Sequence, residues 1–308
     1  MPTGQVVCPL CHAAGSAVRW AEVHGLAVWD CKECSHRFAV APCPAEHVAA
    51  IYDDAYFFGG GAGYADYLQS AAVLRRRGAY YARCMARHAK SGRILDVGAA
   101  AGYTLQAFVE AGWTGFGVEP NATMAAHARR ESGVESLYGR LQEIPAGVEF
   151  DLVAMLQIVA HFADLQAEIR RAAAAVAPSG FLLVETWNHA SFLARMQGRH
   201  WHEYNPPSVL HWFTPAGLPR LVDSGAFEPI DGGRPRRQIT GAHAKSLLAH
   251  VGRSSLLFRG AALGCRVIPD AWAIPYPSWD LFWRLYRRRQ TQPYASTPAF
   301  DRTADNAG

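Results

Sequence analysis

The stretch from Arg93 to Tyr103 has the pattern of a buried strand, a tight turn and the start of a helix. Ile94 to Val97 is a short apolar run, which is typical of a parallel strand buried on both faces. Gly98, Ala100 and Gly102 follow, and their small side chains suit a turn whose backbone approaches a ligand closely. The stretch therefore predicts an α/β fold with a ligand-binding turn between a strand and a helix.

The residues after this turn complete a βαβ unit. Apolar side chains at helical spacing predict a helix from Thr104 to Gly112, and Gly115 to Val118 has the composition of a second strand. That strand ends in Glu119, which lies 23 residues after Asp96. An acidic residue at this point commonly accepts hydrogen bonds from ribose hydroxyls. We therefore expect a nucleotide-binding site in a Rossmann-like fold.

The charge and size of two residues indicate which nucleotide is bound. A dinucleotide fingerprint needs a small residue where the helix packs on the strand, but this chain has Tyr103 there. Asp96, at the end of the first strand, would repel a pyrophosphate. A carboxylate at that place suits S-adenosyl-L-methionine (SAM), which carries an ammonium and a sulfonium cation.

With these motifs the chain resembles the class I SAM-dependent methyltransferases of the small-molecule type, over roughly residues 56–230. Four further segments carry the resemblance in the family's order: Gly117–Pro120, Phe150–His161, Val176–Glu185 and His211–Phe227. The resemblance implies a Rossmann-like seven-stranded methyltransferase sheet with SAM as its cofactor. Together with the turn, it implies that these residues contact the cofactor: Asp96, Gly98, Ala100, Gly102, Tyr103, Glu119, Pro120, Leu141, Gln142, Gln157 and Tyr64.

The chain departs from the family's pattern at three places. Ala100 replaces the usual middle glycine of the turn, and the Glu-His pair after the fourth strand is reduced to His161. Leu141 and Gln142 stand where the family often has an aspartate near the adenine amino group. We therefore expect the adenine contacts to come from backbone and amide groups.

Four of the seven cysteines form two pairs with the spacing of metal ligands. Cys8 and Cys11 make the first pair, Cys31 and Cys34 make the second, and nineteen residues separate the pairs. Two such turns can complete a tetrahedron of thiolates around zinc. We expect residues 1–45 to form a zinc ribbon whose metal is structural.

Methyl transfer requires that the acceptor be positioned and that its proton be removed. Candidate bases should follow the fourth and fifth strands, because ligands of open α/β sheets bind beyond the carboxyl ends of the strands. His161 follows the fourth strand, and a segment rich in histidine and aromatic residues follows the fifth. We rank His211 first as base or acceptor-orienting residue, His161 second, and His202 or Tyr204 third.

The remaining segments suggest how the chain is organised. Residues 46–90 are expected to form a helical linker that folds over SAM through Tyr56 and Tyr64, although a plain flexible linker is the alternative. Residues 91–290 would form the methyltransferase domain, with an insertion at 235–279 whose helices act as a substrate lid. Residues 291–308 have the composition of a disordered tail.

Net charge is distributed unevenly along the chain. Residues 234–289 contain eleven Arg and Lys residues against two Asp, a local charge of +9, whereas the whole chain carries only +4. This charge favours an anionic small-molecule acceptor that is linked to phosphate, a nucleotide or a carrier. The alternative is that the many arginines reflect only a bias in the amino-acid composition of the whole chain. The ribbon region carries three basic and three acidic residues, so nucleic acid is an unexpected partner.

These observations leave three functional hypotheses. The first is a SAM-dependent methyltransferase acting on a small molecule. The alternative is an RNA or protein methyltransferase that docks its substrate on the ribbon and the basic C-terminal segment, and the third is a non-catalytic SAM-binding protein. No apolar run reaches membrane-spanning length and no secretory signal is visible, so we expect a cytoplasmic enzyme. The sequence does not indicate the oligomeric state.

Overall fold

The computed structural model describes residues 6–40, 44–59, 66–222, 225–242, 244–245, 267–270, 272–276 and 278–290. Tyr64, the tail predicted over residues 291–308 and the helices predicted between residues 247 and 258 lie outside the described residues.

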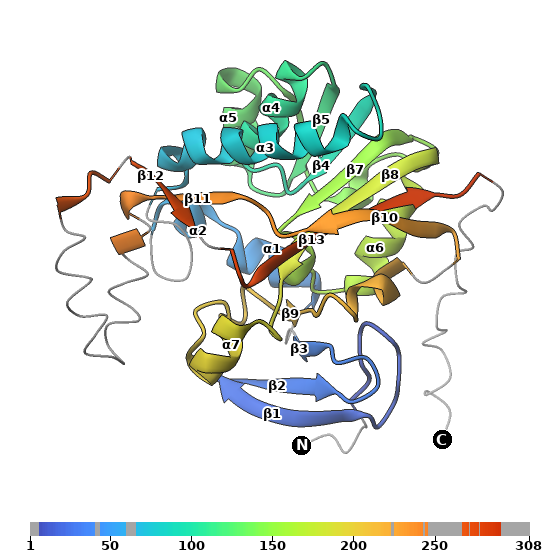
Figure 1. The fold of residues 1–308 in the computed structure, drawn as a ribbon, viewed down its shortest axis with the longest axis vertical. Coiled ribbons are helices and arrows are strands. Elements are labelled where there is room, and N and C mark those ends of the chain that lie inside the picture. Colours follow the sequence, from blue (N-terminus) through green and yellow to red (C-terminus); the bar gives the residue numbers. More distant parts are fainter. Residues whose placement is uncertain are drawn as a thin grey trace.

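Seven strands form a mixed sheet, which confirms the predicted Rossmann-like architecture (Figure 1). Only β13 is antiparallel to its neighbours β8 and β10, while β4, β5, β6, β7 and β8 run parallel. In spatial order the strands are β10 (Phe227–Gly233), β13 (Leu281–Arg288), β8 (Val176–Trp187), β7 (Phe150–Leu156), β4 (Arg93–Val97), β5 (Thr114–Glu119) and β6 (Glu135–Tyr138).

Successive residues of the central strands contribute to two different hydrophobic cores. Ile94 packs with Leu105 and Phe108 on one face of the sheet, whereas Leu95 packs with Ile169 on the other. A strand that is buried on both faces has little use for polar residues, which explains the continuous apolar runs in the sequence. Helices therefore cover both faces of the large sheet.

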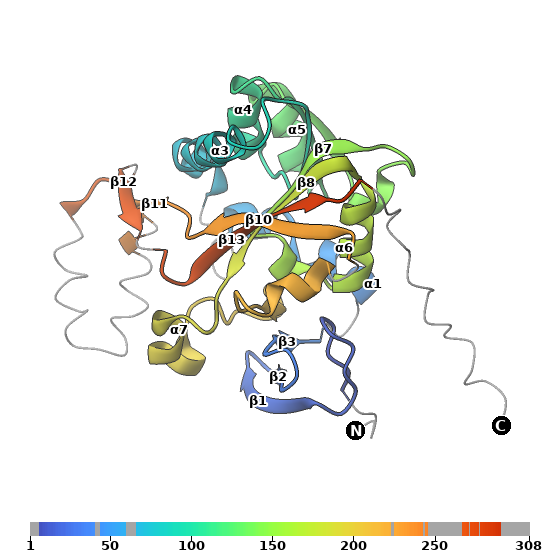
Figure 2. The same cartoon turned by 45° about the vertical axis from the view of Figure 1, so that its right-hand side comes forward.

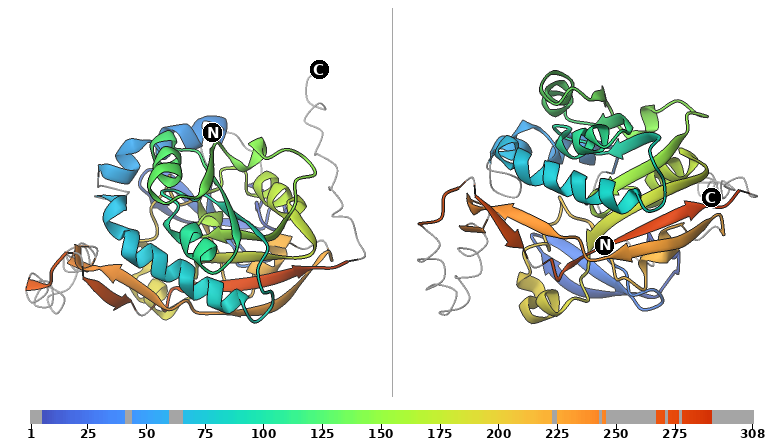
Figure 3. Two further views of the ribbon diagram at one scale, coloured as in Figure 1. Left: turned by 90° about the horizontal axis from the view of Figure 1, so that it is seen from above. Right: turned by 45° about the horizontal axis from the view of Figure 1, so that its top comes forward.

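The helices are arranged in two layers, as Figures 1 and 3 show. One layer holds α3 (Ala71–Met85), α4 (Tyr103–Glu110) and α5 (Ala122–Glu131). The opposite face carries α6 (Leu165–Ala174) and the short 3-10 helix η5 (Leu218–Val222). The remaining short helices lie in connections: α1 (Pro44–Ile51), α2 (Asp54–Phe58), η1 (Tyr67–Ser70), η2 (Leu141–Glu143), η3 (Val159–His161), α7 (Phe192–Gln197) and η4 (Gly198–His200).

A second sheet of four strands lies below the large one (Figures 1 and 2). Its strands are β1 (Ala17–Val23), β2 (Leu26–Cys31), β3 (Arg37–Ala39) and β9 (His211–Trp212). The last of these comes from the middle of the chain and pairs antiparallel with β3. The small sheet is thus completed by residues far outside the predicted module of residues 1–45.

Two further elements differ from the sequence-based expectations. The last strand was expected at residues 279–286, but β13 begins and ends two residues later, at Leu281–Arg288. Within the predicted insertion at 235–279, the structure also shows a two-stranded sheet of β11 (Arg237–Thr240) and β12 (Ala273–Tyr276), for which the sequence analysis offered no expectation.

Candidate active site at the carboxyl edge of the large sheet

The glycine turn after β4 adopts the conformation that its composition suggested. Gly98, Ala100 and Gly102 all have positive φ, at 72°, 46° and 77°. A Cβ added to Gly98 would lie 2.7 Å from Cδ1 of Ile158, in the segment that follows β7. The turn therefore lies directly against the segment that follows β7. Position 98 requires glycine, because a larger side chain would collide with that segment.

Two buried carboxyl groups flank this turn. Glu119, at the end of β5, accepts hydrogen bonds from the backbone N–H of Ala100 and of Asn121, both at 2.8 Å. Asp96 is 5% exposed and Glu119 is 3% exposed. Burial raises the pKa of each carboxyl group to about 7, although nearby Arg77 opposes the rise at Asp96. A bound cation would favour the ionised form of both groups.

A third carboxyl group, Glu185 near the end of β8, is held by two residues of α3. Its Oε1 accepts from the Arg77 guanidinium at 2.8 Å, and its Oε2 accepts from the Tyr81 hydroxyl. Glu185 has no exposed surface, and burial beside it raises the pKa of Tyr81 well above its usual value. The sequence analysis did not identify this group, because nothing in the sequence of α3 shows that Arg77 and Tyr81 contact a residue of β8.

The segment after β7 carries His161, the second-ranked base. Nδ1 of His161 lies 2.8 Å from the main-chain oxygen of Ser208 and 2.9 Å from the hydroxyl of Tyr52. Because a carbonyl oxygen can only accept, we assign the ring proton to Nδ1. Nε2 then carries the unprotonated lone pair of the ring, and the backbone of Gln157 also contacts the ring. Burial lowers the pKa of His161 to about 4, so the ring is neutral near pH 7.

Tyr52, which the sequence did not single out, connects His161 to the cofactor side of the site. Its hydroxyl donates to the Ser208 carbonyl at 2.7 Å, and its own main-chain carbonyl accepts from Asn121 Nδ2 at 3.2 Å. Asn121 in turn donates its backbone N–H to Glu119. Burial raises the pKa of the Tyr52 hydroxyl well above its usual value, so it stays protonated. Its position between two short helices, α1 and α2, leaves no pattern in the sequence.

The segment that contains α2 packs on the glycine turn. Phe57 belongs to one hydrophobic cluster with Ala100, Ala101 and Met124, and Tyr56 and Tyr103 pack against that cluster. Asp54 also accepts hydrogen bonds from the side chains of Asn121 and Thr123, both at 3.0 Å. These contacts place Tyr56 beside the turn.

Other residues predicted to contact the cofactor lie around the same edge. Gly139 donates its N–H to the Glu119 carbonyl at 2.9 Å, so the segment that leads to Leu141 and Gln142 starts beside β5. Leu141 is buried in the core, and the Gln142 amide donates to Glu168. Gln157 follows β7 and has a positive φ of 63°, and the hydroxyl of Tyr103 lies 2.9 Å from His127 Nε2. Pro120 follows Glu119 directly.

The other three base candidates occupy the boundary with the small sheet. His211 is 2% exposed, and its ring contacts the Phe162 carbonyl through Nε2 at 2.8 Å and His36 Nε2 through Nδ1 at 3.2 Å. The Tyr204 hydroxyl accepts from Arg37, and His202 pairs with Glu203 at 2.9 Å. The structure therefore surrounds His211 and Tyr204 with packing contacts, whereas His161 lies in the segment after β7 whose Ile158 approaches Gly98 of the glycine turn.

The four predicted metal ligands lie together at one end of the small sheet, where Cys31 ends β2. The sulfur atoms of Cys8, Cys11, Cys31 and Cys34 are all within 4.8 Å of one another. Sγ of Cys8 is 3.6 Å from that of Cys34, and Sγ of Cys11 is 3.5 Å from that of Cys31. A hydrogen bond from Cys34 lowers the pKa of Cys8 to about 5, which favours its thiolate. The buried members of this cluster belong to the same core as Leu95 in the large sheet.

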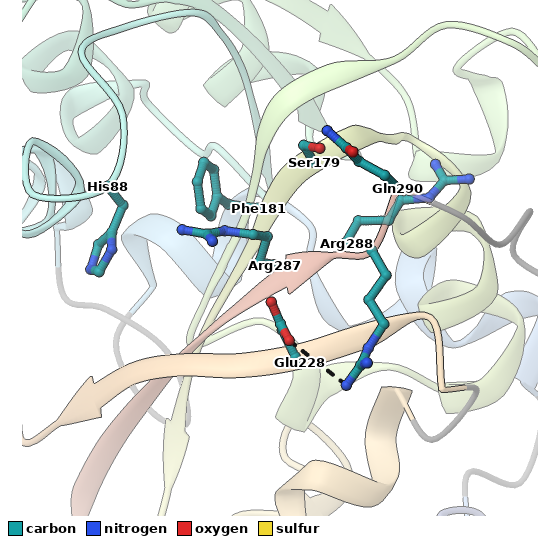
Figure 4. A pocket seen from close by; sticks show the side chains of 8 residues that line it. His88, Ser179, Phe181, Glu228, Arg287, Arg288 and Gln290 are labelled. Atoms are coloured by element: carbon teal, nitrogen blue, oxygen red, sulfur yellow. Dashed lines mark ion pairs between the residues drawn. The ribbon is translucent and has the colours of Figure 1, made fainter.

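A shallow hollow of about 520 Å³ lies at a different place, beside the beginning of β8 and the end of β13 (Figure 4). Arg287 lies over the Phe181 ring, and Arg289 forms an ion pair with Glu228 at 3.7 Å. Ser179 and Phe181 are near the amino end of their strand, whereas Asp96, Glu119 and His161 lie near carboxyl ends. The hollow is therefore separate from the candidate active site.

No helix among the described residues is long and apolar enough to cross a membrane.

Two solved structures share this fold. The 1,6-didemethyltoxoflavin-N1-methyltransferase of Burkholderia thailandensis, solved with bound 1,6-didemethyltoxoflavin and S-adenosylhomocysteine, is 16% identical. The match covers 88% of this chain and 99% of that chain, with a TM-score of 0.51. A complex of the Haloferax volcanii Trm112 methyltransferase activator with a methyltransferase matches at 14% identity, over 73% of this chain and 95% of the other, with a TM-score of 0.52.

Comparison of sequences shows the family. The ubiquinone biosynthesis O-methyltransferase of Azorhizobium caulinodans is 33% identical over 168 residues, which are 51% of this chain and 66% of that protein. The chain thus spans slightly less than two thirds of this curated relative. The sequence profile of a family described as a methyltransferase domain matches residues 66–230, more than half of the 308 residues. The chain belongs to this methyltransferase domain family.

Proposed function

We propose that this protein is a SAM-dependent methyltransferase that transfers a methyl group to a small molecule, with His161 as the general base. One observation carries the proposal: the lone pair of His161 Nε2 and the buried carboxylates of Asp96 and Glu119 lie at the same edge of the sheet. The contact between Gly98 and Ile158 joins the two parts of the site. Such an edge is where open α/β sheets bind their ligands.

The residues around the turn fit the cofactor in charge and in shape. Glu119 retains acceptor capacity for ribose hydroxyls, since each of its oxygens has one backbone N–H partner. Asp96 would attract the ammonium group, and the positive φ of Gly98 and Gly102 lets the backbone approach the cofactor. When bound, SAM supplies an electrophilic methyl group. The segment with Tyr56 would cover it, as its packing on Ala100 supports.

The role of His161 follows from its hydrogen bonds. Ser208 and Tyr52 hold the Nδ1 proton, so Nε2 can accept the proton of an acceptor hydroxyl as the methyl group is transferred. A hydroxyl acceptor is supported by the curated relatives, which are named as O-methyltransferases. His211, whose two ring nitrogens are already hydrogen-bonded inside the protein, is better suited to hold the structure around His161.

The balanced charge of the N-terminal residues supports a small-molecule acceptor rather than RNA. The basic segment at 234–289 supports an acceptor with an anionic group. Of its arginines, Arg288 and Arg289 lie at the hollow away from the carboxyl edge, where both form ion pairs with glutamates. These two arginines therefore add little to the argument for an anionic acceptor.

Calorimetry with S-adenosylhomocysteine and SAM tests the cofactor assignment. Asp96→Ala and Glu119→Ala should each weaken binding by about 10- to 100-fold, because each removes a contact to a charged group. Glu110→Ala is the matched control, since Glu110 lies on the surface of α4 and pairs with Arg75. Absence of binding by the wild-type protein, or equal affinity of all three variants, would overturn the assignment.

We also propose that the four cysteines hold one structural zinc ion and that residues 1–45 form a zinc ribbon. Four thiolates at Zn–S distances of about 2.3 Å place sulfur atoms about 3.8 Å apart. The distances of 3.5 and 3.6 Å between two pairs of sulfur atoms fit this geometry. Metal analysis of freshly purified protein should give about one zinc per chain. Cys31→Ser should lose the metal and lower the melting temperature, whereas Cys84→Ser should retain the metal.

A further inference from the structure

The short helix that carries His161 is attached to the small sheet through the strand β9. The backbone N–H of Leu210 donates to the Ala160 carbonyl at 2.8 Å, and His211 Nε2 donates to the Phe162 carbonyl at 2.8 Å. These two carbonyls lie on either side of His161. Leu210, just before β9, and His211, within it, therefore determine the orientation of the peptide groups on either side of the base.

The other side of β9 is attached to the cysteine-containing part of the chain. The N–H of Ala39 donates to the Leu210 carbonyl at 2.8 Å, and Phe38 lies opposite His211 in the β3–β9 pair. His36, two residues after Cys34, contacts His211 Nδ1 through Nε2 at 3.2 Å. Since the backbone N–H of Cys31 donates to the His36 carbonyl at 2.8 Å, a series of hydrogen bonds runs from the second cysteine pair through His36 and His211 to the backbone around His161.

The two histidine rings are fixed in tautomer as well as in position. His211 Nε2 must carry a proton, because its partner is a carbonyl oxygen, so Nδ1 accepts the proton of His36 Nε2. His36 is 1% exposed and its ring packs against Phe213, with centroids 4.7 Å apart. Neither ring has room to rotate without loss of both packing and hydrogen bonds.

We propose that His36 and His211 are positioning residues through which the small sheet holds the peptide groups on either side of the catalytic base His161, and so keeps its ring within reach of the Ser208 carbonyl that fixes its tautomer. This proposal rests on the function proposed above. If the cysteine-containing turn or His36 is displaced, His211 loses the donor to its Nδ1, and its ring is no longer held against the Phe162 carbonyl. The small sheet then serves catalysis without contacting the acceptor.

Nitrogen NMR of histidine-labelled protein in its metal-loaded form tests the proposal without knowledge of the acceptor, because nitrogen shifts distinguish protonated from bare ring nitrogens. His161→Gln and His211→Gln identify the two signals. In the wild-type protein we expect His161 to be protonated at Nδ1 and His211 at Nε2. A wild-type His211 protonated at Nδ1 overturns the proposal, whether or not any other variant folds.

His36→Phe preserves the ring packing but removes the donor, so the His161 signal should change to a mixture of tautomers. His36→Gln, which can still donate an N–H, should restore the wild-type signal. Glu33→Gln, on an exposed residue between Cys31 and Cys34, is the matched control and should leave the signal unchanged. A wild-type His161 signal in folded His36→Phe would contradict the proposal.

A second measurement separates this proposal from the proposed function. SAM affinity of His36→Phe should equal that of the wild type, because the cofactor turn is not part of the hydrogen-bond series. With an acceptor in hand, His36→Phe should lower kcat about tenfold or more with little change in KM for SAM, and have no further effect in a His161→Gln background. Equal losses in both backgrounds would overturn the positioning role. Failure of wild-type protein to bind SAM would instead overturn the function itself.

Discussion

The hydroxyl of Tyr52 lies 2.9 Å from Nδ1 of His161, although 109 residues separate them in the chain. The main-chain carbonyl of Tyr52 accepts from Asn121, which follows the ribose-binding candidate Glu119. One residue between α1 and α2 is thus hydrogen-bonded both to the proposed base and to Asn121. The position of this segment and the orientation of the base are therefore linked in the fold.

Replacement of the proposed base should separate catalysis from cofactor binding. We expect His161→Gln to lower kcat/KM by about 10²- to 10⁴-fold, which is the usual contribution of a general base. Tyr52→Phe should cost less, about tenfold, because the Ser208 carbonyl still holds the Nδ1 proton. Both variants should bind SAM with wild-type affinity. Steady-state kinetics and calorimetry measure the two effects, and a fully active His161→Gln would exclude this residue as the base.

The affinity for SAM should rise with pH between about pH 6 and 8. Burial raises the pKa of Asp96 and of Glu119 to about 7, so the free protein must lose protons before it can hold the cationic cofactor. Each group contributes at most about tenfold per pH unit below its pKa. Calorimetry across this range checks the slope, and Asp96→Asn should reduce it. A pH-independent affinity would contradict the prediction.

The same two groups should affect the stability of the free protein in the opposite direction. Their ordinary pKa values are 3.8 and 4.5, so the unfolded chain loses these protons first as the pH rises. The folded state then binds more protons than the unfolded state, and their contribution to the unfolding free energy falls between about pH 4 and 7. Urea unfolding of wild-type and Asp96→Asn protein should show a smaller decline in the variant.

The buried ion pair between α3 and β8 should be costly to break. Arg77→Met leaves Glu185 without its cation in a site with no solvent contact, and we expect a loss of about 3–5 kcal/mol in unfolding free energy. Arg75→Met, on the same helix, removes an exposed pair with Glu110 and should change stability by less than about 1 kcal/mol. Denaturant unfolding compares the two variants. Similar losses of unfolding free energy in the two variants would show that burial of the ion pair does not increase the cost of breaking it.

Two glycines with positive φ allow strain to be separated from close contact. Gly98→Ala and Gly112→Ala both place a Cβ on a left-handed residue, which costs about 1–2 kcal/mol. Only the Cβ at residue 98 would meet another group, Cδ1 of Ile158 at 2.7 Å. We therefore expect both variants to lose stability, but only Gly98→Ala to lose SAM affinity as well. Unaltered SAM binding by Gly98→Ala would contradict the proposed place of the turn.

The amino-acid sequence alone determined those features that depend on residues close to one another in the chain. Gly98 and Gly102 indicated the turn, because only small residues suit a positive φ beside a ligand. Ile94 to Val97 indicated a strand buried on both faces, and Glu119 marked the end of the next one. The spacing of the cysteine pairs likewise predicted the cluster that the small sheet contains.

Only the tertiary structure decided which of the candidate bases is enclosed by the small sheet. His161 and His211 have similar surroundings in the sequence, but β9 pairs with β3 and places His211 between His36 and the Phe162 carbonyl. Tyr52 and Glu185 were likewise unmarked, because their partners come from distant segments. Each of these hydrogen bonds joins residues that are more than a hundred positions apart, so it depends on how the sheets and helices pack. Such packing produces no periodic pattern or motif in the sequence around either residue.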